Sequence, residues 1–242
     1  MRAALLALSI AGWEWARLFG QPGFTGSLAG VLGLIWVMLL DVQLPERGLM
    51  GPGVALVLML TLLQMVIRTG RNYPHPENSF MVALAGGLYL GWMGIHLVLL
   101  RNLPDGMYWT LIALPAIFAA DTLAYIFGRL LGRHKLAPRI SPGKTWEGYI
   151  AGVIGAVVIT GLLAALWATQ GAASTFADGA IIGLLVGGLG VVGDLGISAF
   201  KRQMGVKDSS HLLPGHGGIL DRLDSVLVAA AVGYYYVVWF IL

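Results

Sequence analysis

Residues 176–200 read FADGAIIGLLVGGLGVVGDLGISAF, and Asp178 and Asp194 carry the only charges in this stretch. An α-helix rises about 1.5 Å per residue, so about 20 apolar residues cross a hydrocarbon layer of about 30 Å. The stretch is therefore long enough and apolar enough to span a membrane as a helix.

Similar stretches recur along the whole chain. Hydrophobic residues make up 57% of the sequence and charged residues 11%, whereas soluble domains contain about 25% charged residues. We therefore expect an all-α fold, a polytopic integral membrane bundle of about eight transmembrane helices. The expected spans lie near residues 3–20, 25–41, 50–68, 80–100, 107–131, 149–168, 176–200 and 222–242. Two of them, 25–41 and 149–168, are short enough to leave a re-entrant or half-spanning arrangement open.

The length of 242 residues leaves no room for a separate soluble domain. We expect one membrane domain, in which residues 1–106 form N-terminal spans and residues 107–242 carry the site. The absence of cysteine excludes disulfides, thiolate zinc sites and cysteine nucleophiles. The net charge of +3 does not indicate nucleic acid binding, because the basic residues are confined to short loops where they set topology or meet anionic lipid.

The basic residues also predict the orientation of the spans. Twelve of the fifteen Lys and Arg residues lie on the side that follows spans 1, 3, 5 and 7. Under the positive-inside rule this side faces the cytoplasm. We therefore expect a multi-pass protein of the cytoplasmic (inner) membrane, with its site facing the cytoplasm and both termini facing outward.

The densest polar segment is KRQMGVKDSSHLLPGHGGILDRLD, residues 201–224. Asp221 and Asp224 stand at positions i and i+3 of the last expected helix, so they share a face and suit a hard cation. The glycine-rich turn before them offers backbone N–H groups to phosphate. The simpler alternative is helix N-terminal charge with Arg222 as a surface partner. The histidines of this segment match no zinc pattern.

Asp194 and Asp121 are further candidates among the aspartates of the expected spans, where an acid costs about 2.5–3.5 kcal/mol on insertion scales. Asp194 lies two helical turns before Lys201, so it is either half of a structural ion pair or a metal ligand beside Asp221 and Asp224. Asp121 and Tyr125 form a polar stripe toward the loop that follows. For Glu14, the lone acid of the first span, packing against a polar neighbour and lining a cavity both stay open.

The basic loop 133–148 contains Ser141-Pro142-Gly143-Lys144-Thr145. This resembles the tail of a phosphate-binding P-loop, but the GxxxxGKS/T frame is missing and we expect no strand before it. Lys144 and Thr145 suit the oxygens of a triphosphate. A loop that only sets topology explains them equally well.

These residues together resemble the signature of the phosphatidate cytidylyltransferases (CDP-diacylglycerol synthases). The matching segments are 198–202, 207–208 and 214–225, supported upstream by 121–128, 134–148 and 193–195. The resemblance covers residues 121–225, whereas the first half is similar mainly in hydropathy and in Trp13-Glu14-Trp15. The chain is short at its N-terminus for this family, as if a leading span were missing.

The resemblance implies transfer of a cytidylyl group from CTP to phosphatidate, giving CDP-diacylglycerol and pyrophosphate in phospholipid biosynthesis, with Mg²⁺ as cofactor and room for a second cation. The catalytic residues implied are Asp194, Lys201, Arg202, Asp221 and Asp224, of which the three aspartates bind metal. The substrate-binding residues implied are Asp121, Ser141, Lys144, Thr145, Lys207, Asp208, His216, Gly217, Gly218 and Arg222.

Other functions remain open at this point. One is an ion- or proton-coupled transporter or flippase, although its acids would be spread through the spans rather than gathered on one side. Others are a CTP-dependent lipid kinase and a cytidylyltransferase for isoprenoid lipids, which would share the site. The expected partners are CTP, phosphatidate and the lipid bilayer, and a homodimer is one option left open.

Overall fold

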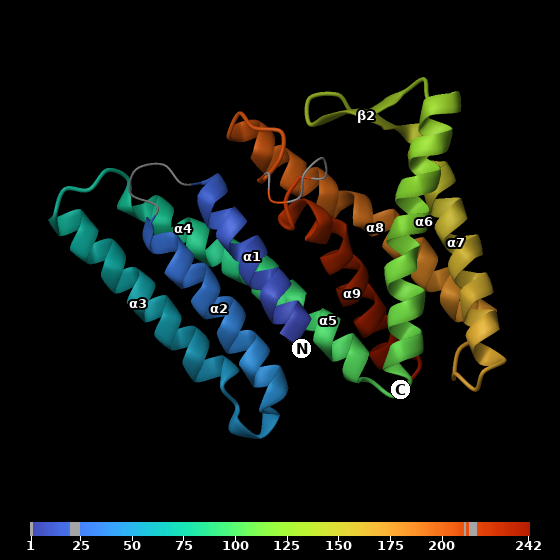
Figure 1. The fold of residues 1–242 in the computed structure, drawn as a ribbon, viewed down its shortest axis with the longest axis horizontal. Helices are drawn as coiled ribbons and strands as arrows, with labels where there is room; N and C mark the ends of the chain where they lie inside the picture. Colours follow the sequence, from blue (N-terminus) through green and yellow to red (C-terminus); the bar gives the residue numbers. More distant parts are fainter. Residues whose placement is uncertain (1, 20–24, 211, 213–216) are drawn as a thin grey trace. The chain divides into compact units, whose positions relative to one another are not determined.

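The computed structural model describes residues 2–19, 25–210, 212 and 217–242. Most of the described chain is helical, which confirms the all-α expectation (Figure 1). The long helices are α1 (Arg2–Leu18), α2 (Thr25–Gln43), α3 (Met50–Gly70), α4 (Pro76–Gly86), α5 (Met93–Asn102), α6 (Gly106–Leu131), α7 (Trp146–Ala168), α8 (Phe176–Gln203) and α9 (Leu220–Phe240). The shorter elements are η1 (Pro45–Arg47), η2 (Gly87–Trp92), β1 (Lys135–Ala137) and β2 (Ser141–Thr145).

Six helical segments of the described chain are long and apolar enough to cross a membrane. They are Met50–Gly70, Pro76–Asn102, Gly106–Leu131, Trp146–Ala168, Phe176–Gln203 and Leu220–Phe240. Helix α1 has 17 residues, and the described apolar part of α2, Leu28–Gln43, is shorter still. The chain is therefore a multi-pass membrane protein, and the count of eight spans stays a prediction.

The chain divides into two compact units. Unit 1 comprises Met1–Val98 and Met204–Leu223, and unit 2 comprises Leu99–Gln203 and Asp224–Leu242. The chain thus returns to unit 1 between α8 and α9. Most of the polar segment 201–224 belongs to unit 1, and its two ends belong to unit 2. The prediction of one membrane domain is not tested by this division.

In unit 2, α6, α7 and α8 pack closely because small residues face one another. A Cβ added to Gly152 of α7 would lie 2.5 Å from the carbonyl oxygen of Ala120 on α6. A Cβ on Gly183 of α8 would meet the backbone of Ala156 on α7 at 2.6 Å. Lipid tails are as apolar as leucine, so such helices associate through close van der Waals contact between small residues.

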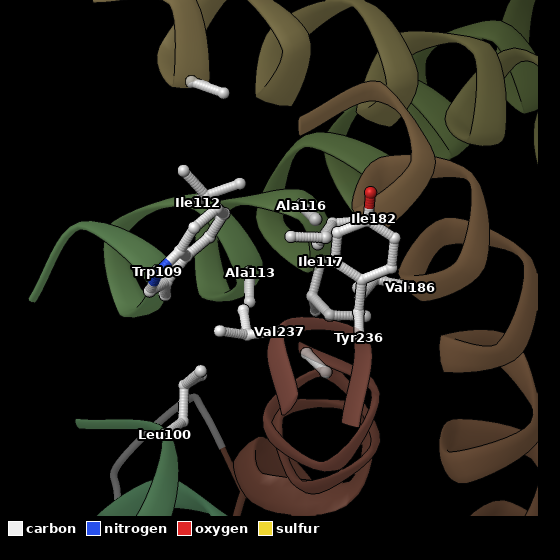
Figure 2. Packing of buried hydrophobic residues seen from close by; sticks show 12 residues of the cluster. Leu100, Trp109, Ile112, Ala113, Ala116, Ile117, Ile182, Val186, Tyr236 and Val237 are labelled. Carbon is white, nitrogen blue, oxygen red and sulfur yellow. The ribbon is translucent and has the colours of Figure 1, made fainter. Parts of the chain in front are cut away.

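A second layer of contacts in unit 2 involves bulkier side chains (Figure 2). The cluster comprises Leu100, Trp109, Ile112, Ala113, Ala116, Ile117, Ala164, Ile182, Val186, Ala229, Tyr236 and Val237. Trp109 and Ile112 come from α6, Ile182 from α8 and Tyr236 from α9. The Tyr236 hydroxyl donates to Asp178 Oδ1 at 2.9 Å. This hydrogen bond connects α9 to the first turn of α8.

Unit 1 is built on α1, α2 and α4. The indole N–H of Trp15 on α1 donates to the Val82 carbonyl oxygen of α4 at 3.1 Å, and Gly86 leaves room for that indole ring. Within the described chain, Thr61 is the one residue of α3 that is buried, and the other residues of this helix are exposed or partly exposed, which is typical of a helix that faces lipid. Helix α3 begins where the Met50 N–H donates to Asp41 Oδ1 at 2.8 Å.

The segment between α6 and α7 differs from the expected loop. Strands β1 and β2 pair antiparallel, with Lys135 opposite Thr145 and Ala137 opposite Ser141. The sequence prediction that this region contains no strand was therefore wrong. Its Pro and Gly residues hide the pattern, since a three-residue strand shows no alternation. The missing P-loop frame is unaffected, because the hairpin does not supply the absent glycine.

Candidate functional site

A cavity of about 320 Å³ opens in unit 2 between α6, α7, α8 and the hairpin. Five residues predicted from the sequence line it: Asp121, Ser141, Lys144, Thr145 and Asp194. They come from α6, β2 and α8, and up to 73 positions separate them in the sequence. The structure therefore gathers the predicted nucleotide-binding loop and two predicted acids around one space.

The rest of the cavity wall is apolar or small. It is formed by Ile117, Ala120, Ala124, Tyr125, Leu136, Gly143, Tyr149, Gly152, Gly187, Gly190 and Val191. The two acids, the lysine and the hydroxyls therefore lie in a cavity wall that is otherwise mainly apolar. A cavity of this kind suits a ligand with both a charged and an apolar part.

The charged groups of the cavity are paired. Lys144 Nζ lies 2.5 Å from Asp194 Oδ2, and both side chains are about a quarter to a third exposed. The Ser198 hydroxyl donates to Asp194 Oδ1 at 3.2 Å. Asp121 lies close enough to Lys144 and Asp194 for their charges to interact. Lys144 thus balances two acids, and an anionic ligand would compete with them for it.

The hairpin is fixed at the point where it enters α7. Thr145 is the N-cap of α7, and its Oγ1 accepts the Gly148 N–H at 3.2 Å. His134 Nδ1 lies 2.6 Å from Glu147 Oε1. The Arg202 side chain of α8 donates from Nε to the Ile140 carbonyl oxygen at 3.1 Å, at the turn of the hairpin. These three contacts hold Lys144 beside α8.

Asp224 is buried, with 5% of its surface exposed. Its Oδ1 accepts the N–H and the hydroxyl of Ser225 at 2.6 and 3.1 Å. Asp224 interacts electrostatically with Asp194 and with Lys201. Gly193 permits this arrangement, because a side chain there would collide with the Asp224 backbone. Two predicted metal ligands, Asp194 and Asp224, are therefore neighbours in unit 2.

The predicted residues Lys207, Asp208, Gly217, Gly218, Asp221 and Arg222 lie in unit 1. Asp221 Oδ2 accepts the backbone N–H groups of Ser209 and Gly218, both at 3.0 Å. Asp208 lines a second cavity, of about 580 Å³, together with Trp13, Arg17, Ser209, Ser210 and Leu212. His216 lies outside the described residues.

Within the part of the chain that the structure describes, no three His, Asp or Glu side chains form a cluster that could hold a metal ion. Asp194 is turned toward Lys144, and Asp221 belongs to the other unit. The triad of Asp194, Asp221 and Asp224 therefore stays a prediction.

Sequence reasoning missed several residues of the site. Tyr149 lines the cavity, and its hydroxyl donates to the Gly188 carbonyl oxygen at 3.0 Å. Gly152, Gly187 and Gly190 line it through their lack of side chains. Tyr149 lies five residues after Lys144, which is not a helical repeat, so the sequence gives no signal for its place in the cavity. The glycines carry no signal that separates them from the other glycines of the spans.

Comparison with known proteins identifies the family of the chain. The model of the cytidylyltransferase family matches residues 1–240. The phosphatidate cytidylyltransferase of Pseudomonas aeruginosa is 37% identical over 245 residues, covering 93% of this chain and 82% of the relative. That of Brucella abortus is 36% identical over 92% of this chain and 78% of its own length, and that of Synechocystis is 46% identical over 60% of this chain and 52% of its own length. The chain therefore belongs to the cytidylyltransferase family, a family of nucleotidyltransferases.

Proposed function

We propose that the protein is a phosphatidate cytidylyltransferase of phospholipid biosynthesis, which converts CTP and phosphatidate into CDP-diacylglycerol and pyrophosphate at the cytoplasmic face of the cell membrane. The names of the relatives support this substrate pair. The observation that carries the proposal is the cavity of unit 2, where Asp121, Lys144 and Asp194 gather between membrane helices. A reaction between a water-soluble nucleotide and a membrane lipid needs a site of this mixed character.

The reaction needs positioning and charge compensation more than covalent help from the protein. A phosphate oxygen of phosphatidate attacks the α-phosphorus of CTP in line. The new P–O bond forms as the bond to the bridging oxygen breaks, and pyrophosphate leaves. The attacking phosphate is already an anion at neutral pH, so no general base is required.

Lys144 is the residue best placed to hold triphosphate oxygens. Its Nζ lies in the cavity wall, within 2.5 Å of Asp194. A bound triphosphate would draw this ammonium group away from Asp194. Ser141 and Thr145 lie on the same strand and offer hydroxyls to the same ligand. Lys201 and Arg202 at the end of α8, with Lys207, are proposed to bind further phosphate oxygens.

The donor set fits a hard divalent cation. Asp194 and Asp224 are neighbouring carboxylates on α8 and α9, and carboxylate oxygens are the ligands that Mg²⁺ prefers. We assign them, with Asp221 one turn before Asp224, to hold Mg²⁺. When bound, the ion would neutralise charge that develops on the phosphate oxygens.

Labelled CTP tests the proposal directly. The full-length protein in lipid nanodiscs is given phosphatidate and CTP labelled at either the α- or the γ-phosphate. We expect α-label in the lipid product and γ-label in pyrophosphate. Lipid labelled from the γ-phosphate would establish a kinase instead. If polyprenyl phosphate but not phosphatidate accepts the α-label, the lipid substrate is an isoprenoid, and if neither label enters lipid, the enzymatic proposal fails.

A further inference from the structure

Glu14 is a fully buried carboxylate on α1, with none of its surface exposed. It accepts four hydrogen bonds from the segment that precedes α9. The Ser210 hydroxyl donates to Oε1 at 2.5 Å and the Ser209 hydroxyl to Oε2 at 3.2 Å. The backbone N–H of Ile219 donates to Oε1 at 3.1 Å and that of Leu220 to Oε2 at 2.6 Å.

This arrangement requires a carboxylate. A carboxylate has about four acceptor positions, whereas a glutamine offers one oxygen and two N–H donors. Glutamine at position 14 would set its N–H₂ group against donors and leave at least part of the network unpaired. Ile219 directly precedes α9 and Leu220 begins it, and the first N–H groups of a helix lack partners within the helix. Glu14 therefore closes the N-terminus of α9, although about 205 residues of sequence separate the two.

The same network reaches Asp221. The Ser209 hydroxyl lies 3.2 Å from Glu14 Oε2 and 3.0 Å from Asp221 Oδ2. Asp221 Oδ2 also accepts the backbone N–H groups of Ser209 and Gly218. Ser209 thus lies between the two carboxylates, which share its single hydroxyl proton, so the position of Glu14 bears on that of Asp221.

Two glycines show how closely this network is fitted. A Cβ on Gly218 would lie 2.5 and 2.6 Å from the two carboxylate oxygens of Glu14. Gly217 has φ of +76°, and a Cβ there would lie 2.8 Å from Asp221 Oδ2. Glycine is needed at the first position for space and at the second for both space and backbone conformation. The segment is therefore shaped around the two carboxylates.

We propose that Glu14 is a positioning residue of the active site, which fixes the start of α9 and thereby orients Asp221. The proposal rests on the proposed function, in which Asp221 binds the metal. It gives a reason for the buried acid of the apolar helix α1. It also gives α1 a part in a site whose other residues come from the second half of the chain.

The test compares Glu14→Gln with Asp41→Asn in full-length protein in nanodiscs. Asp41 also accepts a backbone N–H at a helix start, that of Met50 on α3, so both variants exchange a carboxylate for an amide within unit 1. Amide hydrogen exchange is measured for Ser209, Gly218, Ile219 and Leu220. Steady-state rates of cytidylyl transfer are measured at saturating phosphatidate over a range of CTP concentrations.

We expect Glu14→Gln to speed the exchange of these four amides and to lower kcat by about tenfold or more, because small misplacements of catalytic groups have effects of this size. KM for CTP should change by less than about threefold, since Lys144 and the cavity of unit 2 are untouched. Asp41→Asn should leave both measurements as in the parent protein.

If Glu14→Gln leaves the amide hydrogen exchange unchanged, Glu14 does not hold the start of α9. If exchange is faster but kcat is unchanged, Glu14 has no positioning role in catalysis. An equal loss of kcat in Asp41→Asn would reduce Glu14 to a fold-stabilising residue. If the parent protein transfers no cytidylyl group, the proposed function fails, and the exchange data still decide whether Glu14 holds the start of α9. Ser209→Ala provides a second variant: combined with Glu14→Gln, it should lower kcat by less than the product of the two single effects.

Discussion

Replacing Gly152 with alanine should disturb the cavity through the packing of α6 against α7. The added Cβ would lie 2.5 Å from the Ala120 carbonyl oxygen and 3.1 Å from the Ala124 Cβ. Cβ atoms essentially never approach other atoms within 3.0 Å, so the two helices must separate by about half an ångström at this point. Asp121 follows Ala120 directly and would move with α6.

The energy and the rate follow from this displacement. Overpacking costs about 1–3 kcal/mol, and alanine is favoured over glycine within a helix by about 1 kcal/mol. The net loss of stability should therefore be about 0–2 kcal/mol. The rate should fall by about tenfold, because a misplacement of about 1 Å costs about a hundredfold.

Gly196→Ala is the matched control. It makes the same change within α8, two residues after Asp194, but no atom lies within 4 Å of the added Cβ. The assay is α-label transfer from CTP into lipid, with thermal unfolding of each variant measured in the same detergent. Equal rates for Gly152→Ala and Gly196→Ala would refute the claim that close contact of α6 and α7 shapes the cavity.

Three further perturbations have defined outcomes. Lys144→Met should lower transfer by about a hundredfold, as loss of a group that stabilises transition-state charge typically does. Lys135→Met, at the exposed first position of strand β1, should have less than about a twofold effect, and similar rates for the two variants would remove Lys144 from the site. Excess EDTA should abolish transfer and added Mg²⁺ should restore it, and a rate that persists in EDTA would contradict the metal assignment. Tyr236→Phe should lower the unfolding temperature, because Asp178 loses a hydrogen bond worth about 1.5–3 kcal/mol. Its kcat should stay unchanged because Asp178 lies about 24 Å along α8 from Asp194, and a large loss of kcat would contradict this separation.

The helices were predictable because hydropathy acts locally: each stretch of about 20 apolar residues must satisfy its own backbone hydrogen bonds in lipid. The hairpin was not predictable, because two short strands held by Thr145 and Arg202 depend on contacts with α7 and α8. The candidate residues of the site could be predicted from the polar segment and from the acids within the spans. The side chains with which these residues interact could not be predicted.

Asp194 illustrates the difference. Helical periodicity placed it on the face of Lys201, seven residues later, yet its observed partner is Lys144, fifty residues earlier. The charge of Lys201 also acts on Asp224, which helical periodicity within one span does not predict. Glu14 is a stronger case, because both interpretations of it were open and its partners lie at the other end of the chain. Contacts between distant segments depend on how helices pack, which a single sequence does not specify.

The small residues between α6, α7 and α8 have a consequence for how this protein tolerates change. Since lipid and protein interior are equally apolar, the glycine contacts between these helices depend on side-chain volume more than on hydrophobicity. Glycine to alanine, the mildest substitution in most proteins, is here disruptive at Gly152 and at Gly183. Exchanges among Leu, Ile and Val on the exposed face of α3 should change neither the stability nor the activity of the protein. Among related sequences, we expect the small residues at the helix contacts of unit 2 to vary least.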